Sequence, residues 1–255
     1  MSIIKELSKT LFKGDSPYKY ADSAYVDNGY PHTFINADLV SAVLDVTNCS
    51  FWLELGSMVG GSAITTANVI KKKGINAGVV CIDPFTGDVY MWKENNNLLN
   101  RGKWSFLQLK GCRPTIYDRF IANVVKSDVS DIVLPIPCTS MVGIRLIGAL
   151  HKEKRISSRP DVIYLDSAHE VDETFMELRK SWGLLKNGGI LFGDDWNWDS
   201  VRNDVTKAFG EAPVSNQPLF DKLVSVMPPT ARLGPILLYT HKVNNHTNTH
   251  WLLCK

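Results

Sequence analysis

The feature that most constrains the fold is a stretch, residues 51–84, in which two apolar runs flank a glycine-rich turn and a helical segment. The first run, Phe51 to Leu55, leads into a turn rich in glycine and serine. The helical segment ends in Lys71–Lys73 and Gly74, and these residue types favour a helix C-terminus. The second run is Val79 to Ile82. The order strand, glycine turn, helix and strand predicts one half of a nucleotide-binding α/β fold.

The turn and the residue after the second run indicate a bound ligand. Glycine lets the backbone turn sharply and approach a ligand closely, and the start of a helix offers unpaired N–H groups. Asp83 ends the second strand, where an acidic residue can accept hydrogen bonds from ribose hydroxyls. Because Met58 stands where a G-x-G-x-x-G pattern has its middle glycine, a dinucleotide is disfavoured. A tight strand–helix turn without a ligand is the alternative interpretation.

The rest of the chain continues the alternation of helices and strands. Helices are predicted over residues 37–46, 116–125, 142–151 and 171–185, and strands over 131–136, 162–165 and 190–192. Such βαβ units predict a Rossmann-like, doubly wound, mostly parallel sheet. The tail, with apolar runs at 235–243 and 249–255, predicts a C-terminal antiparallel hairpin. We expect residues 36–255 to form a single domain, residues 1–35 to be an N-terminal appendage or lid, and residues 86–112 to form a long connection.

Composition limits the classes of function. The chain has 255 residues, 44% hydrophobic and 21% charged, with a net charge of +2, which gives no argument for a nucleic-acid partner or an anionic membrane. Its five cysteines lack C-x-x-C spacing, so neither a disulfide framework nor a zinc site is expected. The N-terminus has no signal-peptide pattern and no apolar run approaches the length of a membrane span, so a cytoplasmic location is expected. Both a monomer and a homo-oligomer stay open.

Acidic side chains follow two strands of the predicted sheet. Asp166 comes after the strand at 162–165, and Asp194 and Asp195 come after the strand at 190–192. Ligands of open α/β sheets lie beyond the carboxyl ends of the strands, so these carboxylates should converge. Repelling carboxylates favour a cation, and oxygen ligands favour Mg²⁺ first, then Mn²⁺ or Ca²⁺. The alternative is a helix cap and a solvated turn, and both aspartates of the pair can bind one ion only if the chain turns there.

Two segments resemble known methyltransferases. The pattern E-x-G-x-x-x-G-x-S, Glu54 to Ser62, resembles motif I of the class I S-adenosylmethionine-dependent methyltransferases. The segment YLDSAHEVDETFMELRKSWGLLKNGGILFGDDW is similar to the metal-dependent O-methyltransferases of the catechol and caffeoyl-coenzyme A type. It is closer still to the group of macrocin O-methyltransferase-like enzymes and so-called cephalosporin hydroxylases. The resemblance covers residues 36–255 and implies a seven-stranded sheet.

The resemblance also implies roles for individual residues. It implies that Mg²⁺ is bound by the strand-end aspartates and that the cofactor is bound by the loop, the ribose-binding Asp83 and a residue near the adenine. The metal ligands would be Asp166, Asp194 and Asp195, and the cofactor-binding residues would be Glu54, Gly56, Ser57, Gly60, Ser62, Asp83 and Ser140. His169 stands where the catechol type has a lysine that acts as base, so His169 and Asp166 are the catalytic candidates.

The predicted function is S-adenosylmethionine-dependent O-methyl transfer to a small molecule with a catechol-like or sugar-diol hydroxyl group. Chelation of such a hydroxyl by Mg²⁺ would lower its pKa and orient it. Trp196 and Trp198 could stack on a ring of the acceptor or could be packing residues. Two alternatives remain: a metal-free methyltransferase of another acceptor, and an NAD(P)-dependent oxidoreductase on a similar sheet.

Overall fold

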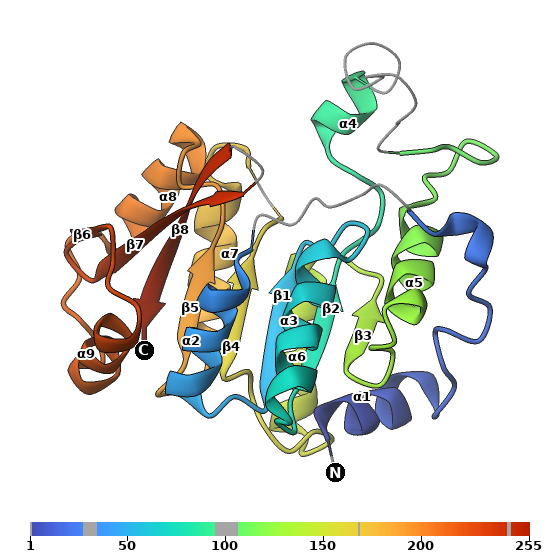
Figure 1. The fold of residues 1–255 in the computed structure, drawn as a ribbon, viewed down its shortest axis with the longest axis horizontal. Coiled ribbons are helices and arrows are strands. Elements are labelled where there is room, and N and C mark those ends of the chain that lie inside the picture. Colours follow the sequence, from blue (N-terminus) through green and yellow to red (C-terminus); the bar gives the residue numbers. More distant parts are fainter. Residues whose placement is uncertain (1, 28–34, 95–106, 168, 244–245) are drawn as a thin grey trace.

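The structure, a computed structural model, describes residues 2–27, 35–94, 107–167, 169–243 and 246–255, which form an eight-stranded sheet with helices on both faces (Figure 1). The strand order is β3-β2-β1-β4-β5-β8-β7-β6. Strands β1 to β5 are parallel, and the last three strands continue the sheet in antiparallel pairs. The strands are β1 (Phe51–Leu55), β2 (Gly78–Ile82), β3 (Val133–Ile136), β4 (Val162–Leu165), β5 (Ile190–Gly193), β6 (Ala231–Leu233), β7 (Ile236–Val243) and β8 (His246–Cys254).

The predicted fold class is confirmed, including the C-terminal antiparallel hairpin of β7 and β8, but the expected number of strands is wrong. The sheet has eight strands in place of seven because the short strand β6 pairs with β7 at the edge. All three side chains of β6 are exposed. A strand that buries no side chain leaves no hydrophobic pattern, so the sequence gives no signal for it.

Helices cover both faces of the sheet. The α-helices are α1 (Ile3–Phe12), α2 (Ala37–Thr47), α3 (Gly61–Lys73), α4 (Val89–Glu94), α5 (Ile116–Lys126), α6 (Ser140–Lys152), α7 (Glu173–Leu184), α8 (Asp199–Phe209) and α9 (Gln217–Val226), with a short 3₁₀ helix η1 (Ser23–Tyr25). The helices and strands predicted between residues 36 and 193 all form, with small shifts at their ends. Asn36 caps α2 by accepting a hydrogen bond from the Asp38 N–H.

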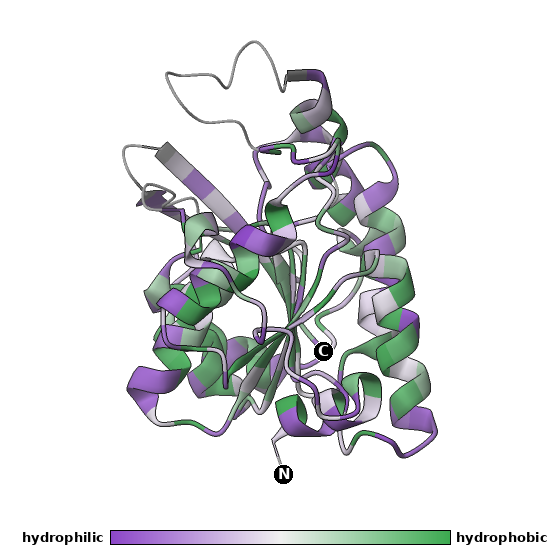
Figure 2. Ribbon diagram, turned by 90° about the vertical axis from the view of Figure 1, so that its right-hand side faces the viewer, coloured by the Kyte–Doolittle hydropathy of each residue, from purple (hydrophilic) through white to green (hydrophobic). Residues whose placement is uncertain are grey.

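The core lies on both sides of the sheet, and β1 illustrates how the sequence divides between them. Phe51, Leu53 and Leu55 pack with side chains of α1, α6, α7 and α8, whereas Trp52 packs with α2, α3, α5 and α9. All five side chains of β1 are buried. A parallel sheet covered on both faces needs apolar residues at successive positions, and Figure 2 shows the central strands mainly in green.

The N-terminal residues are tied to the sheet edge. In α1, Ile3, Ile4 and Leu7 are buried in the core, next to β2 and β3. Farther along, the Asp27 carboxylate accepts a hydrogen bond from Arg119 Nε of α5 at 2.8 Å, and both side chains are buried. The domain boundary at residue 36 and a role of residues 1–35 as a lid stay predictions.

Other sequence-based expectations concern cysteines, membranes and loops. All five cysteines are free thiols. Within the described ranges, every helix falls short of the length and apolar character that crossing a bilayer requires. Of the predicted long connection at 86–112, residues 95–106 lie outside the described residues, as do the stretches 28–34 and 244–245.

Candidate active site

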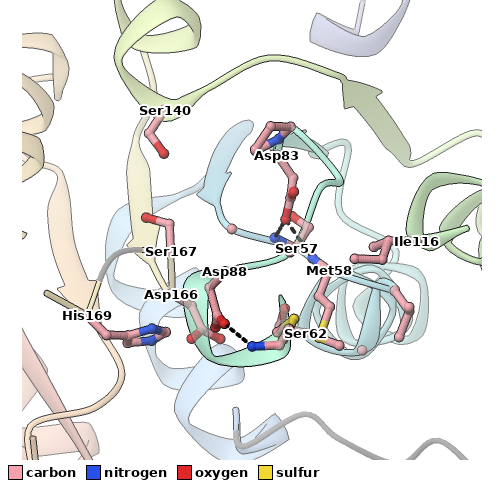
Figure 3. Close-up of a pocket in the computed structure, with 16 residues that line it drawn as sticks. Ser57, Met58, Ser62, Asp83, Asp88, Ile116, Ser140, Asp166, Ser167 and His169 are labelled. Atoms are coloured by element: carbon pink, nitrogen blue, oxygen red, sulfur yellow. Dashed lines mark hydrogen bonds between the residues drawn. The ribbon is translucent and has the colours of Figure 1, made fainter. Parts of the chain in front are cut away.

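A cavity of about 220 Å³ lies at the carboxyl ends of β1, β2 and β4 (Figure 3). Its lining includes Gly56, Ser57 and Ser62 of the glycine turn, together with Asp83 and Ser140. These are five of the seven residues predicted to bind the cofactor. Glu54 of β1 and Gly60 of the turn do not line the cavity. The position agrees with the rule that ligands of open α/β sheets bind beyond the carboxyl ends of the strands.

The glycine turn is held against the end of β4. Gly56 has φ +81°, and a Cβ atom there would lie 2.1 Å from the backbone oxygen of Asp166. Glycine is therefore needed both for the backbone angle and for the close approach of the two loops. Met58, which replaces the middle glycine of the dinucleotide pattern, also has a positive φ of 43°. The turn thus keeps a left-handed backbone at Met58 although its side chain differs from the glycine pattern.

Asp83 fixes the shape of this turn. Its Oδ2 atom accepts hydrogen bonds from the Ser57 N–H at 2.7 Å and the Met58 N–H at 2.8 Å, and Oδ1 accepts one from the Phe85 N–H. Burial raises the pKa of Asp83, although the hydrogen bonds from Ser57, Met58 and Phe85 work in the opposite direction. Asp83 therefore joins β2 to the turn, and its predicted contact with a ribose stays a prediction.

Glu54 lies beneath the turn and is fully buried. Its Oε1 atom accepts a hydrogen bond from the Ser62 hydroxyl at 2.8 Å. In the described part of the chain, its Oε2 atom is buried without a hydrogen-bond partner. Burial raises the pKa of Glu54 from 4.5 to about 7. The bond from Ser62 ties the end of β1 to the start of α3.

The other side of the cavity is formed by the loop after β4, where Asp166, Ser167 and His169 line it. Asp166, His169 and Asp195 each offer one atom that could bind a metal ion, and these three atoms all lie within 4.8 Å of one another. His169 Nε2 is 2.7 Å from Asp195 Oδ2, and the Tyr164 hydroxyl donates to Asp166 Oδ2 at 3.2 Å. The structure therefore brings together two of the three predicted metal-binding aspartates with the predicted catalytic histidine.

The convergence of these charged groups shifts the pKa values of Asp166 and His169. Burial raises the pKa of Asp166 well above its ordinary value, and the charges of Asp194 and Asp195 raise it further. Burial alone lowers the pKa of His169, but the hydrogen bond and negative charge of Asp195 outweigh that effect and raise it to about 9. Clustered carboxylates with raised pKa values are typical of functional sites.

Asp194 makes different contacts, although it lines a small cavity together with Asp166 and Asp195. Its side chain is buried, and its Oδ1 atom accepts hydrogen bonds from the Asp195 N–H at 2.8 Å and from Asn248 Nδ2 at 2.6 Å. Burial and the charge of Asp195 raise the pKa of Asp194 to about 7. The chain does turn at Asp195, with φ 58°, as a shared ion would require of two consecutive aspartates. The role of Asp194 as a metal ligand stays a prediction.

The structure distinguishes the roles of Trp196 and Trp198, which the sequence did not decide. Trp196 is buried in the core and is a packing residue. Trp198 is 43% exposed, and its ring centroid lies 5.1 Å from that of His169. Tyr90 of α4 packs edge-on against Trp198, with ring centroids 6.1 Å apart. An aromatic surface therefore adjoins the acidic cluster.

Sequence reasoning did not identify several residues of the site. Asp88 lines the cavity from the loop after β2, and Glu177 of α7 accepts a hydrogen bond from the Ser167 hydroxyl at 2.7 Å. Asn248 and Tyr90 reach the site from segments without a motif. No local sequence signal identifies such residues, because only the packing of distant elements brings them to the strand ends.

The fold and the cavity define an α/β domain with a cavity at a glycine turn beside a cluster of acidic residues and a histidine. Residues 53–196 match the family described as "Methyltransferase domain". This match spans more than half of the 255 residues, so the chain belongs to this family of methyltransferase domains. A comparison with functionally curated proteins gives no match.

Solved structures share the fold over nearly the whole chain. The O-methyltransferase from Bacillus cereus, solved in complex with SAH, is 13% identical, with 99% of this chain and 97% of that chain covered and a TM-score of 0.50. The cofactor-bound Rv0187 from MTB is 14% identical, with 97% and 93% covered and a TM-score of 0.52. TomG from Streptomyces achromogenes, an O-methyltransferase involved in Tomaymycin synthesis and solved with SAM, is 12% identical, with 100% and 97% covered and a TM-score of 0.50. At these identities the likeness concerns the fold.

Proposed function

We propose that the protein is an S-adenosylmethionine-dependent O-methyltransferase that acts on a hydroxyl group of a small molecule, assisted by a divalent cation, with Mg²⁺ as the first candidate. The observation that carries the proposal is the shared cavity. The glycine turn forms one side of it, and Asp166 and His169 form the other. A cofactor bound on the turn would therefore meet an acceptor held at the acid–base groups. The family match sets aside the oxidoreductase alternative.

The residues of the turn suit this cofactor. Gly56 brings the turn close to Asp166, and a Cβ atom at this position would fill the space between the two. S-adenosylmethionine supplies a sulfonium methyl group that is already activated for transfer. The task of the chain is therefore to bind the cofactor, exclude water and align an acceptor oxygen, and alignment alone contributes much of the rate in such reactions.

The acidic cluster suits a divalent cation. Asp166 and Asp195 offer carboxylate oxygens from two neighbouring strand ends, and hard cations prefer such ligands. The cation would lower the pKa of an acceptor hydroxyl that binds there. His169 has its Nε2 atom on Asp195, which orients the ring, so Nδ1 would be the atom that takes the hydroxyl proton. This role requires a neutral ring, and a cation on the carboxylates would lower the pKa of His169 from about 9 by offsetting the negative charge of Asp195.

The acceptor we propose has two neighbouring hydroxyl groups on a ring, as in a catechol or a sugar diol. Trp198 and Tyr90 offer partly exposed rings beside His169, on which a flat molecule can stack. We propose neither a nucleic acid nor a membrane as the partner, because a net charge of +2 gives no argument for either.

A thermal melting panel tests the cofactor. S-adenosylmethionine, S-adenosylhomocysteine and NAD are each added with Mg²⁺ or with EDTA. A ligand at ~100 times its dissociation constant adds about 2.7 kcal/mol, or roughly 5–10 °C for a chain of this size. A shift with NAD and none with the sulfonium cofactor would contradict the proposal.

Transfer of a labelled methyl group to catechol and sugar-diol acceptors tests the reaction. His169→Gln should abolish transfer while cofactor binding persists. His151→Gln is the matched control, because His151 lies in the last turn of α6, at the far end of that helix from Ser140. EDTA should stop transfer and Mg²⁺ should restore it. Transfer that persists in EDTA would favour the metal-free alternative.

A further inference from the structure

The C-terminal hairpin reaches into the site through strand β8. The side chain of Asn248 donates to Asp194 Oδ1 at 2.6 Å, and the Trp251 indole N–H donates to the Asp194 backbone oxygen at 3.1 Å. The Trp196 N–H donates to the Thr249 backbone oxygen at 3.3 Å. The loop that carries the acidic pair is therefore bonded along the start of β8, from a segment more than fifty residues later in the chain.

The carboxylate of Asp194 is enclosed by this contact. Its side chain is 2% exposed, and its Oδ1 atom accepts two hydrogen bonds, from Asn248 and from the Asp195 N–H. The ring of His250, also fully buried, lies on the same side with Nε2 3.7 Å from Asp194 Oδ1. Asp194 is not among the residues whose ligand atoms converge, which are Asp166, His169 and Asp195.

The backbone turns at Asp195, where the Trp198 N–H donates to the Asp195 backbone oxygen at 2.8 Å and the Asp195 N–H donates to Asp194 Oδ1. Asp195 has φ 58°, a left-handed conformation that aspartate tolerates better than most residues and that the bond to Asp194 supports. This conformation directs the Asp195 carboxylate to His169, 2.7 Å away. Asn248 thus holds Asp194, Asp194 holds the turn, and the turn presents Asp195 to the histidine.

We propose that Asp194 and Asn248 form a positioning pair that sets the Asp195 turn, and that Asp194 is not a ligand of the cation. The statement that Asp194 does not bind the cation rests on the proposed function. The statement that Asp194 and Asn248 set the turn concerns the protein without any metal. The bonding of Asp194 to the hairpin leaves Asp166 and Asp195 as the carboxylates whose oxygens converge with His169.

Mn²⁺ binding, followed by electron paramagnetic resonance of the free ion, separates a ligand from a positioning residue. Asp194→Asn keeps an oxygen that can accept from the Asp195 N–H, so Mn²⁺ affinity should stay within about threefold of the unmodified protein. Asp166→Asn removes a facing carboxylate and should weaken binding at least tenfold. Asn248→Leu removes the amide that holds Asp194, and loss of such an outer contact costs about 10–100-fold in metal affinity. Equal loss in Asp194→Asn and Asp166→Asn would overturn the proposal.

The ring N–H proton of His169, observed by NMR at fixed pH with labelled histidine, tests the positioning without any metal. His169→Gln identifies the resonance. Asn248→Leu should shift it or broaden it away, because Asp195 no longer holds the ring. Thr249→Val is the matched control: Thr249 is the next residue of β8 and is equally buried, but its hydroxyl pairs with Thr240 rather than with Asp194. This control should leave the resonance in place.

The outcomes distinguish the two proposals. An unchanged His169 resonance in folded Asn248→Leu would overturn the positioning pair, whatever the metal does. If Mn²⁺ does not bind the unmodified protein, the metal part of the proposed function fails, and the His169 resonance still decides the positioning. If Asn248→Leu does not fold, Asn248→Ser takes its place, because its shorter side chain also weakens the bond to Asp194. Asn248→Ser should shift the His169 resonance, and an unchanged resonance in the folded Asn248→Ser protein would overturn the pair.

Discussion

Replacement of Gly56 by alanine tests the close approach between the glycine turn and the end of β4. Two costs add at this position. Alanine at a positive φ costs about 1–2 kcal/mol. In addition, its Cβ atom would lie 2.1 Å from the Asp166 backbone oxygen, so one of the two loops must move. Forcing extra atoms into a packed site costs about 1–3 kcal/mol. The free energy of unfolding should therefore fall by about 2–5 kcal/mol, or roughly 5–20 °C in melting temperature.

Gly188→Ala is the matched control. Gly188 has φ +82°, nearly the same as the +81° of Gly56, but no atom lies within 4 Å of its would-be Cβ. Both replacements reduce the entropy of the unfolded chain to the same extent, so this contribution cancels between them. Gly188→Ala should cost only the conformational part, about 1–2 kcal/mol. The difference between the two variants isolates the clash with Asp166.

Urea unfolding of both variants, followed by circular dichroism, measures this difference, and calorimetric titration with S-adenosylmethionine measures its effect on the cavity. We expect Gly56→Ala to be the less stable variant by about 1–3 kcal/mol and to bind the cofactor at least tenfold more weakly. Gly188→Ala should bind it normally, since Gly188 lies in the turn before β5. Equal stability and equal binding in the two variants would refute the close approach of the turn to β4.

Three further predictions concern buried charges. The folded protein holds the Glu54 proton more tightly than the unfolded chain, with a pKa of about 7 against 4.5, so stability should fall as pH rises between these values, by up to about 3 kcal/mol. Glu54→Gln should remove this part of the pH dependence in urea unfolding from pH 4 to 8, whereas the raised pKa values of Asp83, Asp166 and Asp194 maintain the rest, and an unchanged pH profile would count against the role of Glu54. Asp83→Ala should destabilise the protein by about 1–3 kcal/mol and weaken cofactor binding, because three backbone N–H groups lose their acceptor; normal binding and melting would contradict that role. Asp27→Ala should cost about 1.5–3 kcal/mol in thermal unfolding, since it removes a buried hydrogen bond to the charged Arg119 side chain, and a melting temperature equal to that of the unmodified protein would contradict this role.

Part of the site follows from the sequence because it is local. Glu54, Ser62 and Asp83 lie within one strand–helix–strand unit, so their spacing determines that they meet at one strand end. Asp166 is placed by the same rule one strand farther along the sheet. The apolar runs at successive positions likewise determine a parallel sheet buried on both faces, because no other arrangement covers such strands.

Other features were decided by the tertiary structure. Nothing local in the sequence indicates that Asp194 bonds to Asn248, that Trp196 is buried while Trp198 is exposed, or that Tyr90 packs against Trp198. These contacts depend on side-chain direction and on which distant elements meet, and a single backbone turn at Asp195 sends two consecutive aspartates to different partners. Spacing along the chain therefore determines which strand ends carry chemical groups, whereas the packing of α4 and of the C-terminal hairpin decides where those groups point.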